Sequence, residues 1–232
     1  MFPVHSPVSL PEFELRNHFV LTADGRIGGT RSQEPWPGPL FRLVRGKESC
    51  AWAVRADVPR NIADEIDGLA REEPPVSDFR DAPVHAERYT SLLGGEVDSG
   101  PAFTFPEELV QPSGTVFIED LESLDHHFTG WTASEIPYRT PIVTFVEGGY
   151  AVSVCFSAWR SDAAAEAGLE TAEAFRGRGL GPRVTAGWAL AIRASGRVPL
   201  YSTSWSNTAS LAVARKLGLV TYASKWSIHE GG

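Results

Sequence analysis

The chain has 232 residues, of which 42% are hydrophobic and 22% are charged, a composition typical of a globular protein with a sizeable core. Its formal net charge of -8 disfavours a nucleic-acid-binding protein, because such proteins normally carry a basic face. The length fits one enlarged domain or two small ones.

The first hundred residues predict a region of strands, turns and one helix. Residues 17–27 have the pattern of a strand, a tight turn and a second strand. Residues 40–45 and 50–55 predict a hairpin. Residues 61–71 predict a helix with one apolar face, which ends before Pro74. The N-terminus has no basic start followed by a long apolar run, so we expect neither a signal peptide nor a membrane span.

The segment 72–114 is rich in proline, glycine and acidic residues, and it predicts loop over most of its length. We place a domain boundary or a lid at about 100–112, where this composition ends. The predicted organisation is an N-terminal strand and helix region, 1–105, of unassigned role, followed by a domain over 112–232.

The C-terminal half predicts a regular alternation of strands and helices. The clearest hairpin turns at Gly148-Gly149, since glycine adopts the backbone conformations that tight turns need. The predicted elements, in order, are a strand at 114–118, a helical or irregular stretch at 121–128, the hairpin 142–156, a strand at 164–171, a helix at 180–194, a strand at 198–204, a helix at 208–217 and a strand at 220–228.

A glycine-rich loop, Arg176-Gly-Arg-Gly-Leu-Gly181, joins the strand 164–171 to the helix 180–194. Glycines let a backbone approach a ligand closely, and a helix N-terminus presents unpaired N–H groups. Together they predict a phosphate or pyrophosphate site, with arginines adding positive charge. The dinucleotide fingerprint fails because its sixth position is Pro182, and no Gly-Lys-Ser/Thr triplet for a kinase-type loop occurs. The remaining pattern is Arg-x-x-Gly-x-Gly.

A second motif follows at Asn207-x-x-Ser210, where Asn207 or Ser206 can cap the helix that closes at Gly218. With both motifs in this order, the C-terminal half of the chain, from about residue 112, resembles the GNAT superfamily of N-acetyltransferases, and the motifs themselves lie within 166–219. The resemblance implies that the first motif holds the pyrophosphate of acetyl-CoA and that Asn207 lies beside the pantetheine arm. It implies an α+β fold, with a mixed, mostly antiparallel sheet flanked by helices, and an additional N-terminal region.

The resemblance also implies direct attack by a neutral amine on the acetyl thioester. Backbone N–H groups at about residues 169–171 would stabilise the oxyanion, because that strand splays from its neighbour. The residues that the resemblance assigns to acetyl-CoA are Leu169, Thr171, Arg176, Gly177, Arg178, Gly179, Leu180, Gly181, Asn207 and Ser210.

The groups that move protons are less clearly specified. Glu166, Glu170 and Glu173 lie near the strand and could accept the proton of the amine, although carboxylates there are usually solvated. A water chain competes with them. The family's general acid, a tyrosine four residues before the last glycine, is replaced by Ala214. Tyr201 or Tyr222 could substitute, although strand tyrosines are more often core or rim residues.

Other reactive residues lack a supporting pattern. His126-His127 suits a substrate loop, but a solvated pair is the commoner case. No paired cysteines or histidines have metal-ligand spacing, so we expect no metal site. Cys50 and Cys155 lie in apolar runs, which favours buried free thiols in a reducing compartment.

Two functions follow as hypotheses. The first is a cytoplasmic N-acetyltransferase that uses acetyl-CoA as co-substrate and acts on a small-molecule or protein amine. The second is an acyl-CoA-binding sensor or interaction module without turnover, which Ala214 motivates. A donor bulkier than acetyl stays open, as does the oligomeric state, a homodimer included. No nucleic-acid or membrane partner is expected.

Overall fold

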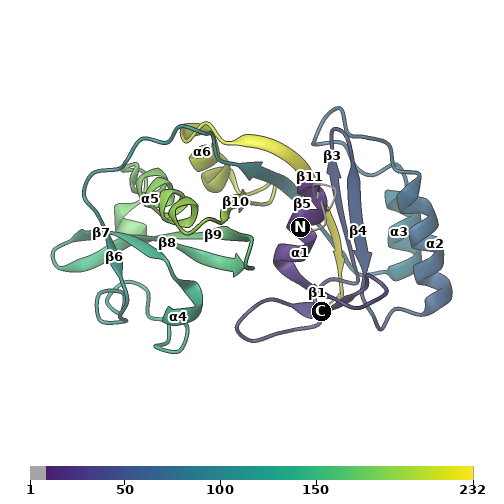
Figure 1. The fold of residues 1–232 in the computed structure, drawn as a ribbon, viewed down its shortest axis with the longest axis horizontal. Helices are drawn as coiled ribbons and strands as arrows, with labels where there is room; N and C mark the ends of the chain where they lie inside the picture. The colour runs from purple at the N-terminus through teal and green to yellow at the C-terminus, as the bar shows by residue number, and fades with distance from the viewer. Residues whose placement is uncertain (1–8, 232) are drawn as a thin grey trace, which may run out of the picture. The chain divides into compact units, whose positions relative to one another are not determined.

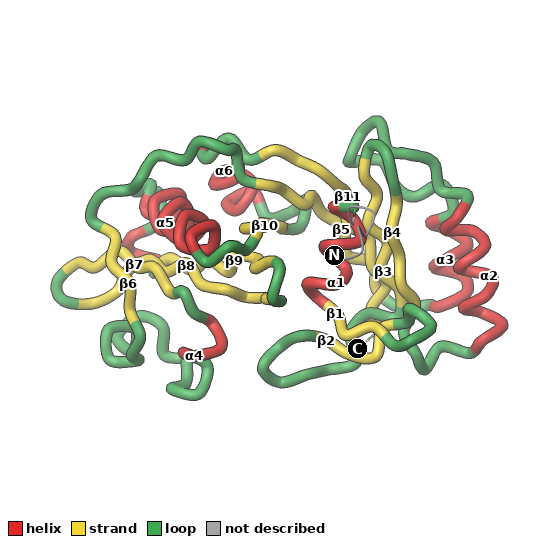
Figure 2. The backbone as a smooth tube through the Cα atoms, viewed as in Figure 1, coloured by secondary structure: helices red, strands yellow, loops and turns green. Residues whose placement is uncertain are grey.

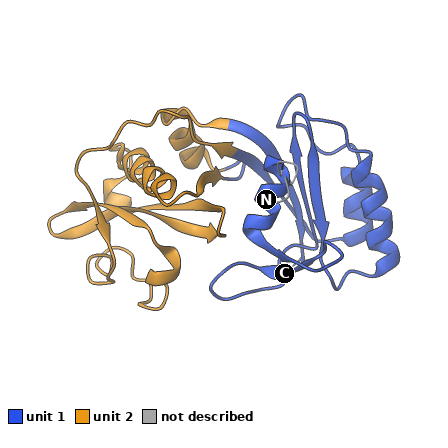
Figure 3. Ribbon diagram, viewed as in Figure 1, with its two compact units in different colours: residues 1–102, 203–206, 221–232 blue, residues 103–202, 207–220 orange. Residues whose placement is uncertain are grey.

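The computed structural model describes residues 9–231, which form two compact units (Figure 3). Unit 1 contains the described residues up to Ala102, together with Thr203–Ser206 and Thr221 onwards. Unit 2 contains Phe103–Ser202 and Asn207–Val220. These units differ from the linear division predicted from the sequence, because the end of the chain returns to unit 1 as a strand.

Unit 1 is built on a sheet with the strand order β4-β3-β11-β5 (Figure 1). Antiparallel pairs join β3 to β4 and β3 to β11. A separate two-stranded sheet, β1 with β2, forms the predicted strand, turn and strand. The strands are β1 (Phe19–Leu21), β2 (Ile27–Thr30), β3 (Phe41–Gly46), β4 (Cys50–Val54), β5 (Glu96–Thr104) and β11 (Val220–His229).

Helices cover both faces of this sheet, as Figure 2 shows in red. The predicted helix is α2 (Arg60–Arg71), and it packs with α3 (Ala86–Leu93) over Phe41 and Leu43 of β3. On the opposite face, α1 (Leu10–His18) packs over Val44 through Leu15. The alternation of β3 side chains therefore separates two cores within the unit.

The structure adds elements that the sequence did not predict. The segment 72–114 is loop over most of its length, as predicted, but it also contains α3 and β5. The pattern hid them because α3 is only two turns long and the first half of β5 is polar and exposed. The helix α1 was not predicted either. Its inner face is polar, with Glu14 and His18 buried against Arg42, so it lacks an apolar stripe.

Unit 2 has a five-stranded sheet in the order β10-β9-β8-β7-β6. Its pairs are antiparallel except β9 with β10, which is parallel because α5 crosses between them. The strands are β6 (Thr115–Ile118), β7 (Ile142–Glu147), β8 (Tyr150–Arg160), β9 (Ala164–Thr171) and β10 (Val198–Ser202). The helices are α4 (Ile136–Arg139), the 3₁₀ helix η1 (Glu173–Phe175), α5 (Leu180–Ala194) and α6 (Thr208–Lys216).

The core of unit 2 lies between its sheet and α5. Val184, Trp188 and Ile192 of α5 are each 0% exposed, as the helical spacing predicted. Cys155 of β8 is buried in the same core, and α6 packs beside α5. The opposite face is covered by α4 and by turns that contribute Leu124.

The predicted α+β class with a mixed, mostly antiparallel sheet is confirmed by these pairings. Within residues 9–231, no helix has the length and apolar character that crossing a membrane would require.

A buried carboxylate fixes the long connection before α3. Glu73 accepts hydrogen bonds from the backbone N–H groups of Val84 and His85, each at 3.0 Å, and from the Tyr89 hydroxyl at 3.2 Å. Arg45 lies 4.0 Å from the same carboxylate. Burial, and then the charge of Glu73, raise the pKa of Tyr89, so its hydroxyl stays a proton donor. Glu73 thus ties β3 and α3 to the loop between them.

We predict that Glu73→Gln lowers the free energy of unfolding by about 2 kcal/mol, because hydrogen bonds to a charged group contribute about 1.5–3 kcal/mol. Urea unfolding of the full chain measures this loss. Glu72→Gln is the matched control, since the side chain of Glu72 is 75% exposed. Equal midpoints for the two variants would contradict the anchoring role of Glu73.

Candidate functional site

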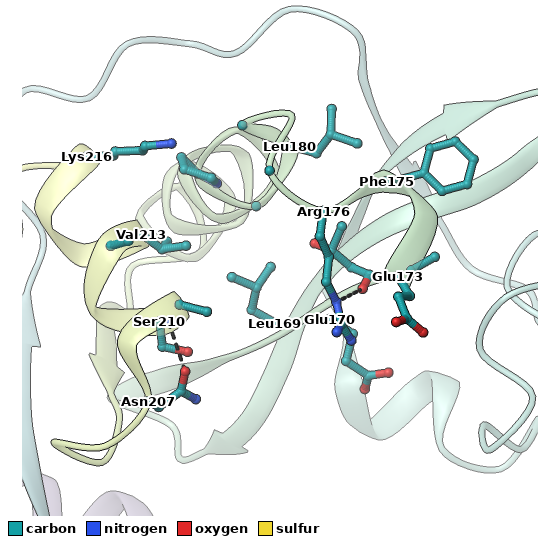
Figure 4. Close-up of a pocket in the computed structure, with 18 of the residues that line it drawn as sticks. Leu169, Glu170, Glu173, Phe175, Arg176, Leu180, Asn207, Ser210, Val213 and Lys216 are labelled. Atoms are coloured by element: carbon teal, nitrogen blue, oxygen red, sulfur yellow. Dashed lines mark hydrogen bonds between the residues drawn. The ribbon is translucent and has the colours of Figure 1, made fainter.

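A cavity of about 640 Å³ lies in unit 2 where β9 ends (Figure 4). Its walls are the end of β9, η1, the loop that follows it, the first turn of α5 and the inner side of α6. Leu169 projects from β9 into the space between Val213 of α6 and Leu180 of α5, as Figure 4 shows. The volume is within the range of small-molecule sites.

The predicted glycine loop forms one wall of the cavity. Gly177 and Gly179 have φ angles of 76° and 75°, in the left-handed region that other L-residues rarely adopt. A Cβ atom at either glycine would meet no atom within 4 Å. The backbone is therefore open to the cavity, and a side chain at Gly179 would enter this open space.

The loop leads directly into α5, whose N-terminus also lines the cavity. No side chain caps this helix, and Pro182 in its first turn has no N–H group to be satisfied. The N–H groups of Leu180 and Gly181 are at the positive end of the helix dipole. Gly181 approaches β9 closely, because a Cβ there would lie 3.4 Å from Leu169.

The two arginines of the loop differ in their placement. Arg176 lines the cavity, and its Nε donates a 3.1 Å hydrogen bond to the Thr171 carbonyl (Figure 4). Arg178 does not line the cavity. Its guanidinium forms a 2.7 Å ion pair with Glu147 and lies over the Phe175 ring. The Arg178 guanidinium, for which a phosphate contact was predicted, is thus paired with the β7–β8 hairpin outside the cavity lining.

Strand β9 separates from β10 beside the cavity. The parallel pairing with β10 ends at Glu166, whereas β9 stays paired to β8 as far as Thr171. The Ala172 N–H donates to Val152 of β8, so by alternation the N–H groups of Leu169 and Thr171 face the side that β10 has left. The strand therefore offers backbone donors to the cavity, in the place where the splay was expected.

The first turn of α6 forms another wall. The Asn207 side chain accepts a 3.0 Å hydrogen bond from the Ser210 N–H, which makes Asn207 the N-cap (Figure 4). Both residues line the cavity, as does Lys216 at the end of the helix. Of the residues predicted for acetyl-CoA, the cavity thus brings together Leu169, Thr171, Arg176, Gly177, Gly179, Leu180, Gly181, Asn207 and Ser210.

The three predicted proton-transfer residues lie in different places. Glu170 is exposed and lines the cavity. Glu166 is only 5% exposed and accepts a 2.5 Å hydrogen bond from the Ser202 hydroxyl, outside the cavity lining. Tyr201 lies in the core under α5, where its hydroxyl donates to the Ser210 carbonyl at 3.4 Å. Burial raises the pKa of Tyr201 to about 12.

The sequence reasoning missed several residues of the cavity wall. His127, Phe128 and Phe175 line it, although His127 was expected to be part of a solvated pair. Turns that contain no regular element carry His127 there, so neither period nor motif could identify it. Ala214, in the place of the expected tyrosine, is 4% exposed and packs in the core under α5.

Taken together, the cavity offers backbone donors for an oxyanion, an open glycine loop at a helix N-terminus for a phosphate, and carboxylates and an imidazole for a cationic group. No serine or cysteine nucleophile with an adjacent base lines it among the described residues.

Comparison with known proteins agrees with this geometry. Residues 143–228 match the family model described as GNAT acetyltransferase. A search of curated proteins finds no match to the chain.

Solved structures resemble the chain at low identity. A GNAT-family protein from Novosphingobium aromaticivorans is 19% identical with a TM-score of 0.49, over 59% of this chain and 66% of its own, just under two thirds of its length. A GCN5-related N-acetyltransferase-like protein from Streptococcus suis is 18% identical with a TM-score of 0.48, over 83% and 85%. A GCN5-related N-acetyltransferase from Sphaerobacter thermophilus is 15% identical with a TM-score of 0.47, over 93% and 82%.

Because these TM-scores are below 0.5, the assignment depends on the sequence match. The matched segment contains the β7–β8 hairpin, β9, the glycine loop, α5, β10 and α6. The similarity to the GNAT acetyltransferase family is therefore established over residues 143–228 of this chain.

Proposed function

We propose that this protein transfers the acetyl group of acetyl-CoA to a primary amine by direct attack. One observation carries the proposal. Strand β9 leaves β10 after Glu166 at the point where the left-handed glycine loop and the uncapped N-terminus of α5 meet the same cavity. A donor site for an oxyanion and a donor site for a diphosphate therefore share one space.

The diphosphate would occupy the loop between Gly177 and Gly181. Main-chain N–H groups at a helix N-terminus, with the positive end of the dipole, are a common anion site. Of the two arginines in the loop, only Arg176 lines the cavity, so we propose that Arg176, and not Arg178, contacts the diphosphate. The pantetheine arm would then run between β9 and α6, past Asn207.

The reaction needs the thioester carbonyl beside the N–H groups of Leu169 and Thr171. The amine nitrogen forms a bond to the carbonyl carbon, and negative charge develops on the oxygen that these donors face. The carbon–sulfur bond then breaks, and the thiolate leaves. A free thiol has a pKa of about 8.5, so the thiolate can depart without an acid from the protein.

Among the predicted proton-transfer residues, Glu170 and Glu173 line the cavity, and Glu170 lies at the end of β9 beside the backbone donors. Its exposed carboxylate is suited to attract the ammonium form of the acceptor. Glu166 and Tyr201 are held by Ser202 and by the core, and we propose no contact with the substrate for either.

A second candidate function is acyl-CoA binding without turnover. It is favoured by Ala214, which is buried in the core where the family has a general acid. This candidate predicts acyl-CoA affinity with no product.

Incubation of the protein with acetyl-CoA and a panel of primary amines separates the two functions. We expect free thiol to appear in proportion to acetylated amine, both followed in the same samples by a thiol reagent and mass spectrometry. Donors with longer acyl chains test the chain preference. Binding of acetyl-CoA with no product from any amine would leave the binding module as the function.

We predict that Gly179→Val abolishes binding of coenzyme A, because its side chain would enter the open space of the loop. Gly196→Val is the matched control at the other end of α5. Gly196 has a φ of 78° and, like Gly179, no atom within 4 Å of the Cβ position. Both variants carry the left-handed strain of about 1–2 kcal/mol. Calorimetry should show lost affinity for G179V only, and equal affinities would remove the loop from the site.

We further predict that Arg176→Ala weakens coenzyme A binding about tenfold, which corresponds to about 1.4 kcal/mol. Arg178→Ala should change the affinity much less, because its guanidinium pairs with Glu147 outside the cavity. Titration at low and high salt measures both, and the loss in R176A should shrink as salt screens the charge. A larger loss in R178A would reverse this assignment.

A further inference from the structure

The walls of the cavity differ in chemistry. The wall formed by α6 carries Lys216, whereas the end of β9 and η1 carry Glu170 and Glu173 (Figure 4). Phe175 and His127 line the cavity as well. The β9–η1 side thus combines carboxylates with aromatic rings, which suits a cationic amine better than a phosphate.

His127 is held at this wall by ring contacts. Its imidazole meets the Phe175 ring edge-on, with centroids 5.4 Å apart, and the His126 ring at 4.5 Å. His126 in turn stacks on Tyr150 of β8 at 4.2 Å. These contacts join the turns before α4 to η1 and to the β7–β8 hairpin. His127 is therefore half-buried and positioned without using its ring nitrogens.

Neither ring nitrogen of His127 hydrogen-bonds to another residue in the part of the chain that the structure describes. Here both nitrogens stay available to a molecule in the cavity. Imidazole is also the side chain whose protonation changes near neutral pH, where a general base is most effective.

We propose that His127 is the general base of the acetyl transfer, a role that depends on the proposed function. Glu170 attracts the ammonium form of the acceptor, and the His127 imidazole takes one proton from it. The neutral nitrogen then forms its bond to the acetyl carbon. The second proton leaves that nitrogen as the carbon–sulfur bond breaks, and the departing thiolate takes up one proton to become the thiol of coenzyme A. The imidazolium returns its proton to water, so one proton is released for each amide formed.

Several charged or titratable groups share the cavity with His127 or contact its ring, and each can affect the pH dependence of activity. Glu170 and Glu173 are the acidic groups that line it, and Arg176 and Lys216 are the basic ones. His126 is the titratable group in ring contact with His127. The pH dependence of the wild type alone therefore does not identify His127 as the base. The pH profiles of the wild type and of the variants must be compared.

The test uses the full chain, acetyl-CoA and the best amine from the panel. We measure kcat/KM for the amine across about pH 5–8, the range in which imidazole side chains in general change charge, in wild type, His127→Gln, His127→Ala and Glu170→Gln. Asp125→Asn is the control, because Asp125 is an exposed acid in the same turn and does not line the cavity. Calorimetry of acetyl-CoA binding reports whether each variant keeps its donor site.

We expect H127Q to lower kcat/KM by about 10²–10⁴-fold, the usual contribution of a general base, and to flatten the rise of activity with pH. Acetyl-CoA affinity should stay that of wild type, and added imidazole should restore part of the activity of H127A. E170Q should mainly raise KM for the amine, and D125N should match wild type.

The outcomes separate this inference from the proposed function. An active wild type with unchanged H127Q, or a loss of the pH-dependent rise in E170Q in place of H127Q, overturns the role of His127 alone. A loss in H127Q with no rescue of H127A and an unaltered pH profile also overturns it, since that result indicates packing. A wild type that binds acetyl-CoA but acetylates no amine overturns the proposed function and this inference with it.

Discussion

The candidate site depends on one backbone feature, the parting of β9 from β10. Up to Glu166 both edges of β9 are paired, and beyond it only the edge toward β8 is. A buried strand normally pairs both edges, because an unpaired N–H away from water costs free energy. The opening is tolerated here because Thr171 and Leu169 face a cavity in which a ligand or water can accept from them. Every other component of the site is arranged around that opening.

Most of the fold of unit 2 could be predicted from the sequence because its signals are local. The helix predicted at 180–194 is α5 itself, since its apolar spacing, Pro182 and Gly196 define both ends. The hairpin at Gly148-Gly149 was equally clear. An element was missed where sequence pattern and burial disagree. In α1 the buried positions are polar, and Arg42, distant in sequence, pairs with Glu14. No local window contains that information.

The site divides in the same way. The residues assigned through the glycine loop and Asn207 line one cavity, because those motifs describe short backbone segments. The placements of Arg178 and His127, in contrast, could be found only from the three-dimensional structure. Arg178 was expected at a phosphate, but its partner Glu147 lies on a hairpin thirty-one positions earlier in the chain. His127 reaches the cavity through ring contacts with Phe175, which the spacing of histidines does not encode.

The open site is supported by the core beneath it. An uncapped helix end and an open strand edge leave backbone groups without protein partners. About two turns further along α5, Trp188 is fully buried, and its indole N–H donates to Ser157 at 3.3 Å. That hydrogen bond links α5 to β8, the strand to which the end of β9 is paired. Trp188 does not line the cavity, so a substitution there would act on the site through the core, by changing how the N-terminus of α5 is held beside β9.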